Sequence, residues 1–126
     1  MAKILIVEDD SILSDLYNNT FTFAGYTTVT AKNGLEGLDK ARQEKPDIIF
    51  LDLMMPKMNG LDLIGELKKD ETTKNIPVII LSNFSDEKLA KEALAKGALA
   101  YVIKSDYEPK QVIELAQKWL SEKISS

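Results

Sequence analysis

The chain has 126 residues, a hydrophobic content of 44% and a formal net charge of −4. This length predicts one domain with a buried core, and the composition is that of an ordinary soluble globular protein. The acidic balance does not favour non-specific nucleic-acid binding, which needs a basic surface. Cysteine and histidine are both absent. This absence excludes disulfides, thiolate catalysis, cysteine-based zinc sites and a Ser-His-Asp triad.

The sequence predicts neither a signal peptide nor a membrane span. After Lys3 only a short apolar run precedes the first acidic residues, so no signal peptide is predicted. No apolar run approaches the ~20 residues that a membrane span needs. We therefore expect a cytoplasmic protein with no membrane contact. We also expect one domain over residues 1–126, without an effector domain.

Short apolar runs alternate with amphipathic stretches, which is typical of βα units on a parallel sheet. In chain order, the predicted strands and helices are Lys3–Val7, Ser11–Ala24, Thr27–Thr30, Leu35–Glu44, Asp47–Leu51, Leu61–Lys69, Val78–Leu81, Asp86–Lys96, Ala100–Ile103 and Pro109–Glu122, beginning with a strand. The pattern predicts an α/β fold, a flavodoxin-like doubly wound sheet of five parallel strands in the order 2-1-3-4-5 with five helices. The threonine-rich second strand is expected at an edge of the sheet.

Acidic residues stand at the ends of the first and third strands. Glu8, Asp9 and Asp10 follow the first, and Asp52 follows the third. In the predicted order these strand ends are neighbours, at the edge where open α/β sheets bind ligands. Crowded carboxylates repel one another unless a cation is present, and oxygen ligands of this kind suit Mg²⁺ or Mn²⁺. For Asp10, which precedes the helix start at Ser11, helix capping is the simpler interpretation.

Two further polar residues end predicted strands near this edge. Lys104 follows the last strand and can offer an ammonium group to an anion in the crevice. Ser82 follows the fourth strand, and its hydroxyl can donate to a phosphoryl oxygen. Taken singly, each has a simpler interpretation, a solvated strand end for Lys104 and a turn or capping hydroxyl for Ser82.

Four pieces of the sequence resemble the receiver domain of response regulators in two-component signalling, of the stand-alone, CheY-like kind. The pieces are Ile4–Asp10, Asp52–Gly60, Leu81–Ser82 and Gly97–Lys104, and the similarity runs from Lys3 to Lys118. Each piece alone is modest evidence, but the four occur in the order and at the spacings of the family.

The resemblance implies a role for each residue of the acidic crevice. Asp52 would be the phosphoacceptor for a partner histidine kinase or histidine phosphotransfer protein. Glu8 and Asp9, with Asp52 and the backbone carbonyl of Met54, would hold Mg²⁺ or Mn²⁺. Lys104 would pair with the phosphoryl oxygens.

The resemblance also implies a conformational switch. Ser82 would bond to the phosphoryl group and move inward, and Tyr101 would turn into the vacated space. The changed surface, residues 86 to 122, would then bind a downstream protein whose identity the sequence does not give. For Tyr101 the alternative is a half-buried strand aromatic with its hydroxyl in water.

The chain departs from the family after Lys104. The family usually has proline there, joined by a cis peptide bond, whereas this chain has Ser105. A non-proline cis bond is costly, so either a trans bond with a re-routed loop or a strained cis bond is expected. The loop Ser105–Glu108 is also one residue longer than usual, and the direction of the Lys104 side chain depends on how this loop runs.

Two more pairs of residues are predicted to affect phosphorylation, one through access to the phosphoryl group and one through kinase docking. Asn83 and Phe84 follow Ser82, and we expect them to tune access to the phosphoryl group and its lifetime. Ile12 and Leu13 start the first helix, which in receiver domains is a kinase-docking surface; core packing is the alternative for both.

The leading hypothesis is a signalling phosphoacceptor rather than an enzyme. The alternative is a binding module of the same fold that is never phosphorylated. A phosphatase with an aspartyl nucleophile needs an acid two residues after Asp52, where Met54 stands. A flavin carrier needs a phosphate-binding loop after the first strand, where the acids would repel a phosphate.

Overall fold

The computed structural model describes residues 2–53, 55, 57–83 and 85–125, with the side chains of residues 122–125 excepted. Strands and helices alternate along the chain. In order they are β1 Lys3–Val7, α1 Ser11–Phe23, β2 Thr27–Ala31, α2 Gly34–Glu44, β3 Ile48–Asp52, α3 Gly60–Lys69, β4 Val78–Ser82, α4 Glu87–Lys96, β5 Ala100–Ile103, the 3₁₀ helix Lys104–Asp106 and α5 Pro109–Ser125.

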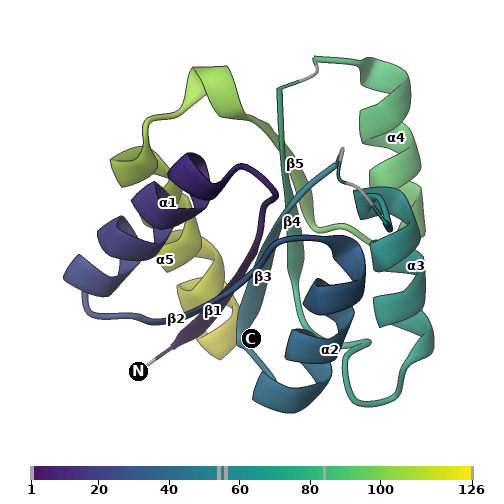
Figure 1. Ribbon diagram of the computed structural model, residues 1–126, viewed down its shortest axis with the longest axis horizontal. Coiled ribbons are helices and arrows are strands. Elements are labelled where there is room, and N and C mark those ends of the chain that lie inside the picture. Colours follow the sequence, from purple (N-terminus) through teal and green to yellow (C-terminus); the bar gives the residue numbers. More distant parts are fainter. Residues whose placement is uncertain (1, 54, 56, 84, 126) are drawn as a thin grey trace.

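The five strands form one parallel sheet in the order β2-β1-β3-β4-β5, which confirms the predicted fold. Helices α1 and α5 cover one face of the sheet, and α2, α3 and α4 cover the other (Figure 1). This arrangement brings the ends of β1 and β3 together, because these two strands pair directly. Within the described part of the chain, no helix is long and apolar enough to cross a membrane.

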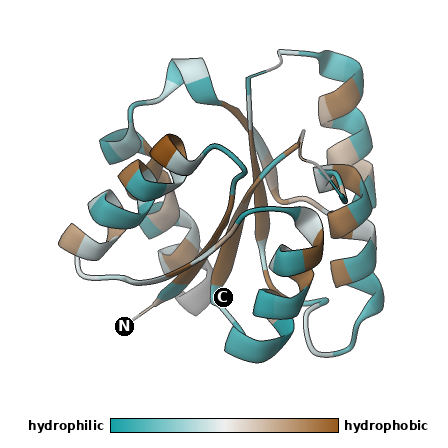
Figure 2. Cartoon of the chain, in the orientation of Figure 1, coloured by the Kyte–Doolittle hydropathy of each residue, from teal (hydrophilic) through white to brown (hydrophobic). Residues whose placement is uncertain are grey.

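The central strands are buried on both faces, as their continuous apolar sequence predicts. Along β1, Leu5 and Val7 join the core cluster under α2 to α4, whereas Ile4 and Ile6 join the cluster under α1 and α5. The strands accordingly form a hydrophobic centre between helices whose surfaces are a mixture of hydrophilic and hydrophobic residues (Figure 2), with Ile12 and Phe23 of α1 exposed. Strand β2 is mostly half-exposed, which confirms its place at the edge.

The structure moves several predicted boundaries by a residue or more, and two of these shifts matter for the site. Asp52 is the last residue of β3 and pairs with Leu81, so it belongs to the strand rather than to the loop. Ser82 is likewise the last residue of β4, where it pairs with Ile103. Both side chains therefore start from backbone that the sheet holds in place.

Helix α3 begins in close contact with the end of β3. The Gly60 N–H donates to the carbonyl of Leu53 at 2.8 Å. A Cβ atom on Gly60 would lie 2.8 Å from the carbonyl oxygen of Asp52 and 2.9 Å from the Cα of Leu53. On the same helix, Gly65 has open space where its Cβ would be. The two glycines therefore offer a matched pair for substitution.

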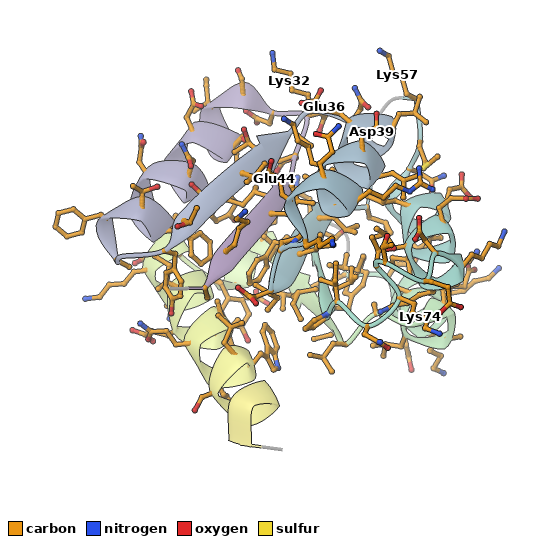
Figure 3. The ribbon with its side chains drawn as sticks, turned by 90° about the horizontal axis from the view of Figure 1, so that it is seen from below. Lys32, Glu36, Asp39, Glu44, Lys57 and Lys74 are labelled. Carbon is orange, nitrogen blue, oxygen red and sulfur yellow. The ribbon has the colours of Figure 1, made fainter. Side chains whose placement is uncertain are left out.

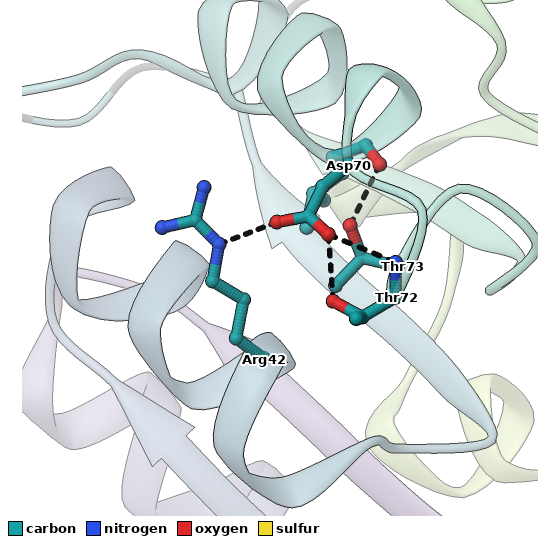
Figure 4. Close-up of polar contacts among 5 residues, drawn as sticks. Arg42, Asp70, Thr72 and Thr73 are labelled. Atoms are coloured by element: carbon teal, nitrogen blue, oxygen red, sulfur yellow. Dashed lines mark hydrogen bonds and ion pairs between the residues drawn. The ribbon is translucent and has the colours of Figure 1, made fainter.

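An ionic cluster ties α2 to the turn that follows α3 (Figure 4). The Arg42 Nε donates to Asp70 Oδ2 at 2.6 Å, and the backbone N–H and the hydroxyl of Thr72 donate to Asp70 Oδ1 at 2.8 and 2.7 Å. These contacts lower the pKa of Asp70 from 3.8 to about 2. The hydroxyl of Thr72 has the largest effect, followed by Arg42 and then the Thr72 N–H.

We predict opposite effects for alanine at the two glycines of α3. Gly60→Ala should destabilise the fold by about 1–3 kcal/mol, since backbone must move to admit the methyl group. Gly65→Ala should stabilise it by about 0.5–1 kcal/mol, since alanine favours the helix and meets no neighbour. Urea unfolding measures both, and equal effects would contradict the contact at Gly60.

We also predict a pH-dependent effect of Asp70→Asn. The folded-state pKa of Asp70 lies below the ordinary value of 3.8, so its ionised form stabilises the fold above that pH. The variant should therefore melt at a lower temperature than the wild type at pH 7. This deficit should shrink as the pH falls from 3.8 towards 2, when the wild-type carboxyl gains its proton. The exposed Asp39 of α2 (Figure 3) supplies the control, Asp39→Asn, for which no deficit is expected.

Candidate functional site

Three carboxylates converge at the ends of β1 and β3. Glu8 directly follows β1, and its N–H donates to the carbonyl of Ala31 at 3.0 Å. One carboxylate oxygen from each of Glu8, Asp9 and Asp52 lies within 4.8 Å of the other two. Glu8 is buried, Asp52 is half-buried and Asp9 is exposed. The crevice therefore has a buried floor and an open mouth. Asp10 lies outside this group and caps α1, accepting from the N–H groups of Ile12 and Leu13, as its simpler interpretation predicts.

Lys104 points into the same crevice. Its Nζ lies 2.5 Å from Glu8 Oε1 and 3.6 Å from Asp52 Oδ2, and only 9% of the side chain is exposed. The loops after β2 and β3 also carry lysines, Lys32 and Lys57, but both extend outward from the molecule (Figure 3). Lys104 is thus placed to contact an anion bound at Asp52.

The backbone after Lys104 follows the trans alternative. No peptide bond among the described residues is cis, and Lys104 begins a 3₁₀ turn that includes Ser105. The N–H of Tyr107 closes this turn on the carbonyl of Lys104 at 3.3 Å. Of the two alternatives left open by the sequence, the structure has a trans bond and a re-routed loop, with the ammonium still directed at the acids.

The charges in the crevice favour the binding of a cation. Burial, followed by the neighbouring carboxylate of Asp52, raises the pKa of Glu8 from 4.5 to about 7, although Lys104 opposes the shift. Glu8 Oε2 is buried and has no hydrogen-bond partner among the described residues. One ammonium does not balance three carboxylates. A buried carboxylate oxygen beside two further carboxylates fits a hard divalent ion such as Mg²⁺.

Ser82 and Tyr101 lie on the neighbouring strands β4 and β5. Ser82 is fully buried and stands one residue beyond Leu81, the partner of Asp52 in the ladder. Tyr101 is half-buried and, together with Asp86 and Ala90, lines a pocket of about 270 Å³ between α4 and β5. Ser82 is therefore near the acidic crevice, whereas Tyr101 faces the surface that α4 and β5 share.

The other predicted site residues divide into three groups. Asn83 is exposed directly after β4, at the rim of the site. Phe84 and Met54 lie outside the described residues, so their predicted roles have no structural counterpart here. Ile12 is 81% exposed, but Leu13 is half-buried and packs against the core under α1 and α5. Of the two predicted docking residues, only Ile12 lies on the free surface of α1.

Sequence reasoning missed two residues that border the site. Tyr17 is buried on α1, and its burial, then the charges of Glu8 and Asp52, raise its pKa to about 12. Gly34 starts α2, and a Cβ there would lie 2.2 Å from the carbonyl oxygen of Met58. The glycine lets the loop after β3 pass close to α2. Its position at an element boundary was the only signal in the sequence.

Known proteins resemble this chain over nearly its whole length. The model of the response regulator receiver domain matches residues 4–117. The polar-differentiation response regulator DivK of Brucella anthropi is 33% identical over 120 residues, covering 95% of this chain and 97% of DivK. The solved structure of the chemotaxis protein CheY4 of Vibrio cholerae has a TM-score of 0.87 at 29% identity, covering 94% and 98% of the two chains. A CheY-like receiver domain protein of Methanospirillum hungatei has a TM-score of 0.91 at 26% identity, covering 99% and 98%.

The raised pKa of Glu8 predicts how the stability of the metal-free protein depends on pH. The folded state binds the Glu8 proton more tightly than the unfolded state, so the free energy of unfolding should fall as the pH rises from 4.5 through about 7. Glu8→Gln should lose this part of the pH dependence. The exposed Glu92 of α4 provides the control, Glu92→Gln, which should keep the wild-type profile. Urea unfolding across this pH range in the presence of a chelator measures the difference, and parallel profiles for wild type and Glu8→Gln would refute it.

Proposed function

Because the chain belongs to the response regulator receiver domain family of two-component signalling, we propose that it accepts a phosphoryl group on Asp52. The observation that carries the proposal is the position of Lys104, whose ammonium lies 3.6 Å from Asp52 Oδ2 inside a cluster of three carboxylates. A carboxylate that ends a strand, is half-exposed and faces a buried ammonium is suited to receive an anionic group. The donor is a histidine kinase or a histidine phosphotransfer protein.

The transfer is an in-line displacement at phosphorus. A carboxylate oxygen of Asp52 forms the new O–P bond, and the P–N bond of the donor phosphohistidine breaks. The leaving imidazole keeps the electron pair of that bond and takes up a proton. Lys104 stabilises the charge on the phosphoryl oxygens, and the sheet holds Asp52 in line for the attack. The reaction therefore depends on positioning and electrostatics more than on acid–base groups.

Glu8, Asp9 and Asp52, with the backbone carbonyl of Met54, are the proposed ligands for Mg²⁺ or Mn²⁺. The bound ion supplies neutralising charge for the transferring phosphoryl group. Among the described residues, Glu8 Oε2 is buried without a hydrogen-bond partner and three carboxylates face the one ammonium of Lys104, and both observations support this ligand set. Met54 enters it from the family resemblance alone.

We assign the switch to Ser82 and Tyr101. The Ser82 hydroxyl would hydrogen-bond to a phosphoryl group on Asp52, which ends the neighbouring strand. That contact would draw in the loop after β4 and favour an inward Tyr101, whereas Asn83 and Phe84 are the residues that we propose tune access to the phosphoryl group and its lifetime. The surface of residues 86 to 122 would then change its affinity for a downstream protein, and coupling of this kind is typically about 1–3 kcal/mol.

The proposal describes a signalling domain of the cytoplasm, without direct nucleic-acid or membrane binding, that acts through protein partners. Residues 1–126 would form the single receiver domain. Ile12, exposed at the start of α1, is the residue we assign to kinase docking. The alternative is a receiver-fold module that is never phosphorylated, of which Ser105 would be a symptom. The contacts of Lys104 with Glu8 and Asp52 favour the phosphoacceptor over that alternative.

Phosphorylation by a small acyl phosphate tests the proposal directly. With acetyl phosphate and Mg²⁺, the intact mass of the wild type should rise by one phosphoryl group. Asp52→Asn should show no rise, because its amide is not a nucleophile, and Asp39→Asn should behave as the wild type. A chelator should suppress the reaction of the wild type. Equal labelling of the wild type and Asp52→Asn would rule out Asp52 as the acceptor.

A further inference from the structure

The segment between β5 and α5 has one side chain that anchors it to the core. Of the residues that follow Lys104, Ser105, Asp106 and Glu108 are exposed. Tyr107 is half-buried and packs against the core cluster that lies between the sheet and helices α1 and α5. Between Lys104 and the start of α5, the ring of Tyr107 is therefore the side chain that packs this segment against the core.

The same residue is joined to Lys104 through the backbone. The Tyr107 N–H donates to the Lys104 carbonyl at 3.3 Å and closes the single 3₁₀ turn Lys104–Asp106. A lone 3₁₀ turn has poor hydrogen-bond geometry and gives little stability of its own. On the far side of Tyr107, the backbone N–H of Glu108 donates to Gln111 Oε1 at 2.8 Å, which fixes the start of α5. Tyr107 thus connects a weak turn to a firm helix.

The backbone at Lys104 must be fixed, because its side chain extends into a crevice formed by other parts of the sheet. Its ammonium is nearly buried and reaches Glu8, which follows β1, and Asp52, which ends β3. A lysine side chain has four rotatable bonds, so holding it in one conformation costs entropy. The Lys104 ammonium stays directed at the carboxylates only if the backbone of Lys104 is fixed. Strand β5 fixes that backbone on one side, since it ends at Ile103, and the turn must fix the other.

We propose that Tyr107 is a positioning residue for phosphoryl transfer: its packing against the core fixes the turn after β5 and so aims Lys104 at Asp52. The inference rests on the proposed function for its consequence, the rate of phosphorylation. The geometric part, that Tyr107 keeps the Lys104 ammonium inside the crevice, stands independently of it.

Tyr107→Ala and a matched control separate positioning from general stability. Tyr26 is also half-buried, packs against the same core cluster and contacts Phe21 edge-on with ring centroids 5.8 Å apart, but it follows α1 and is remote in sequence from the turn. Tyr107→Ala should slow phosphorylation by acetyl phosphate about tenfold, within the range that a misplaced group costs. Tyr26→Ala should lower the melting temperature yet keep the rate, and Tyr107→Phe should keep both.

A double-mutant cycle shows whether the effect passes through Lys104. If it does, Tyr107→Ala should cause no further loss of rate in a Lys104→Ala background. An equal loss in both backgrounds would overturn the inference, as would an unchanged rate in Tyr107→Ala alone.

Reactivity of the lysine gives a readout that does not need phosphorylation. An amine-specific acylating reagent, followed by peptide mass mapping, should modify Lys104 slowly in the wild type and in Tyr26→Ala, and clearly faster in Tyr107→Ala. Unchanged labelling in Tyr107→Ala would overturn the inference. If Lys104 becomes reactive while even the wild type takes no phosphoryl group, the positioning role holds and the proposed function fails.

Discussion

The site depends on one buried ammonium placed among carboxylates that repel one another. Strands β1 and β3 pair directly, so their terminal acids are forced together, and β5 delivers Lys104 across the end of β4. Burying such a group of charges costs stability, because each loses its hydration and only some are paired. Two observations show that cost: the pKa of Glu8 is raised, and its Oε2 has no hydrogen-bond partner in the part of the chain that the structure describes. A crevice that is electrostatically incomplete in this way favours a bound cation and a bound anion together, which is what phosphoryl transfer requires.

Burial of the apolar core on both faces of the sheet offsets this cost, and the strands hold the backbone of the site in place. The central strands are buried on both faces between two clusters of apolar side chains. Asp52 and Ser82 are the last residues of such strands, so the ladder fixes their backbone while their side chains reach past it. The contact of Gly60 with the end of β3 holds the start of α3 against the same place. Lys104 differs from these residues, because it begins the 3₁₀ turn after β5 and so starts outside the sheet.

The sequence predicted what local pattern and topology determine together. Apolar runs at β1, β3 and β4 predicted buried parallel strands, the strand order followed from the alternation of elements, and the meeting of Glu8, Asp9 and Asp52 followed from the order. What it did not predict depends on packing between residues far apart in the chain. Ile12 and Leu13 are similar side chains at adjacent positions, yet only Ile12 is exposed to solvent. Contact with the core determines which side of α1 faces the sheet, and the two residues alone do not encode it. The choice between a cis and a trans bond at Ser105, and the anchoring by Tyr107, depend on contacts that no local pattern encodes.

The gradient of burial across the three carboxylates also supports a division of roles. Glu8 is buried and so is the least accessible of the three, and burial disfavours its charged form, which raises its pKa. Asp9 is exposed, and water screens its charge and competes for its oxygens. Asp52 lies between these limits, fixed by the sheet, open on one side and faced by Lys104. A nucleophile needs both access and a fixed direction of attack, and of the three carboxylates Asp52 alone combines them.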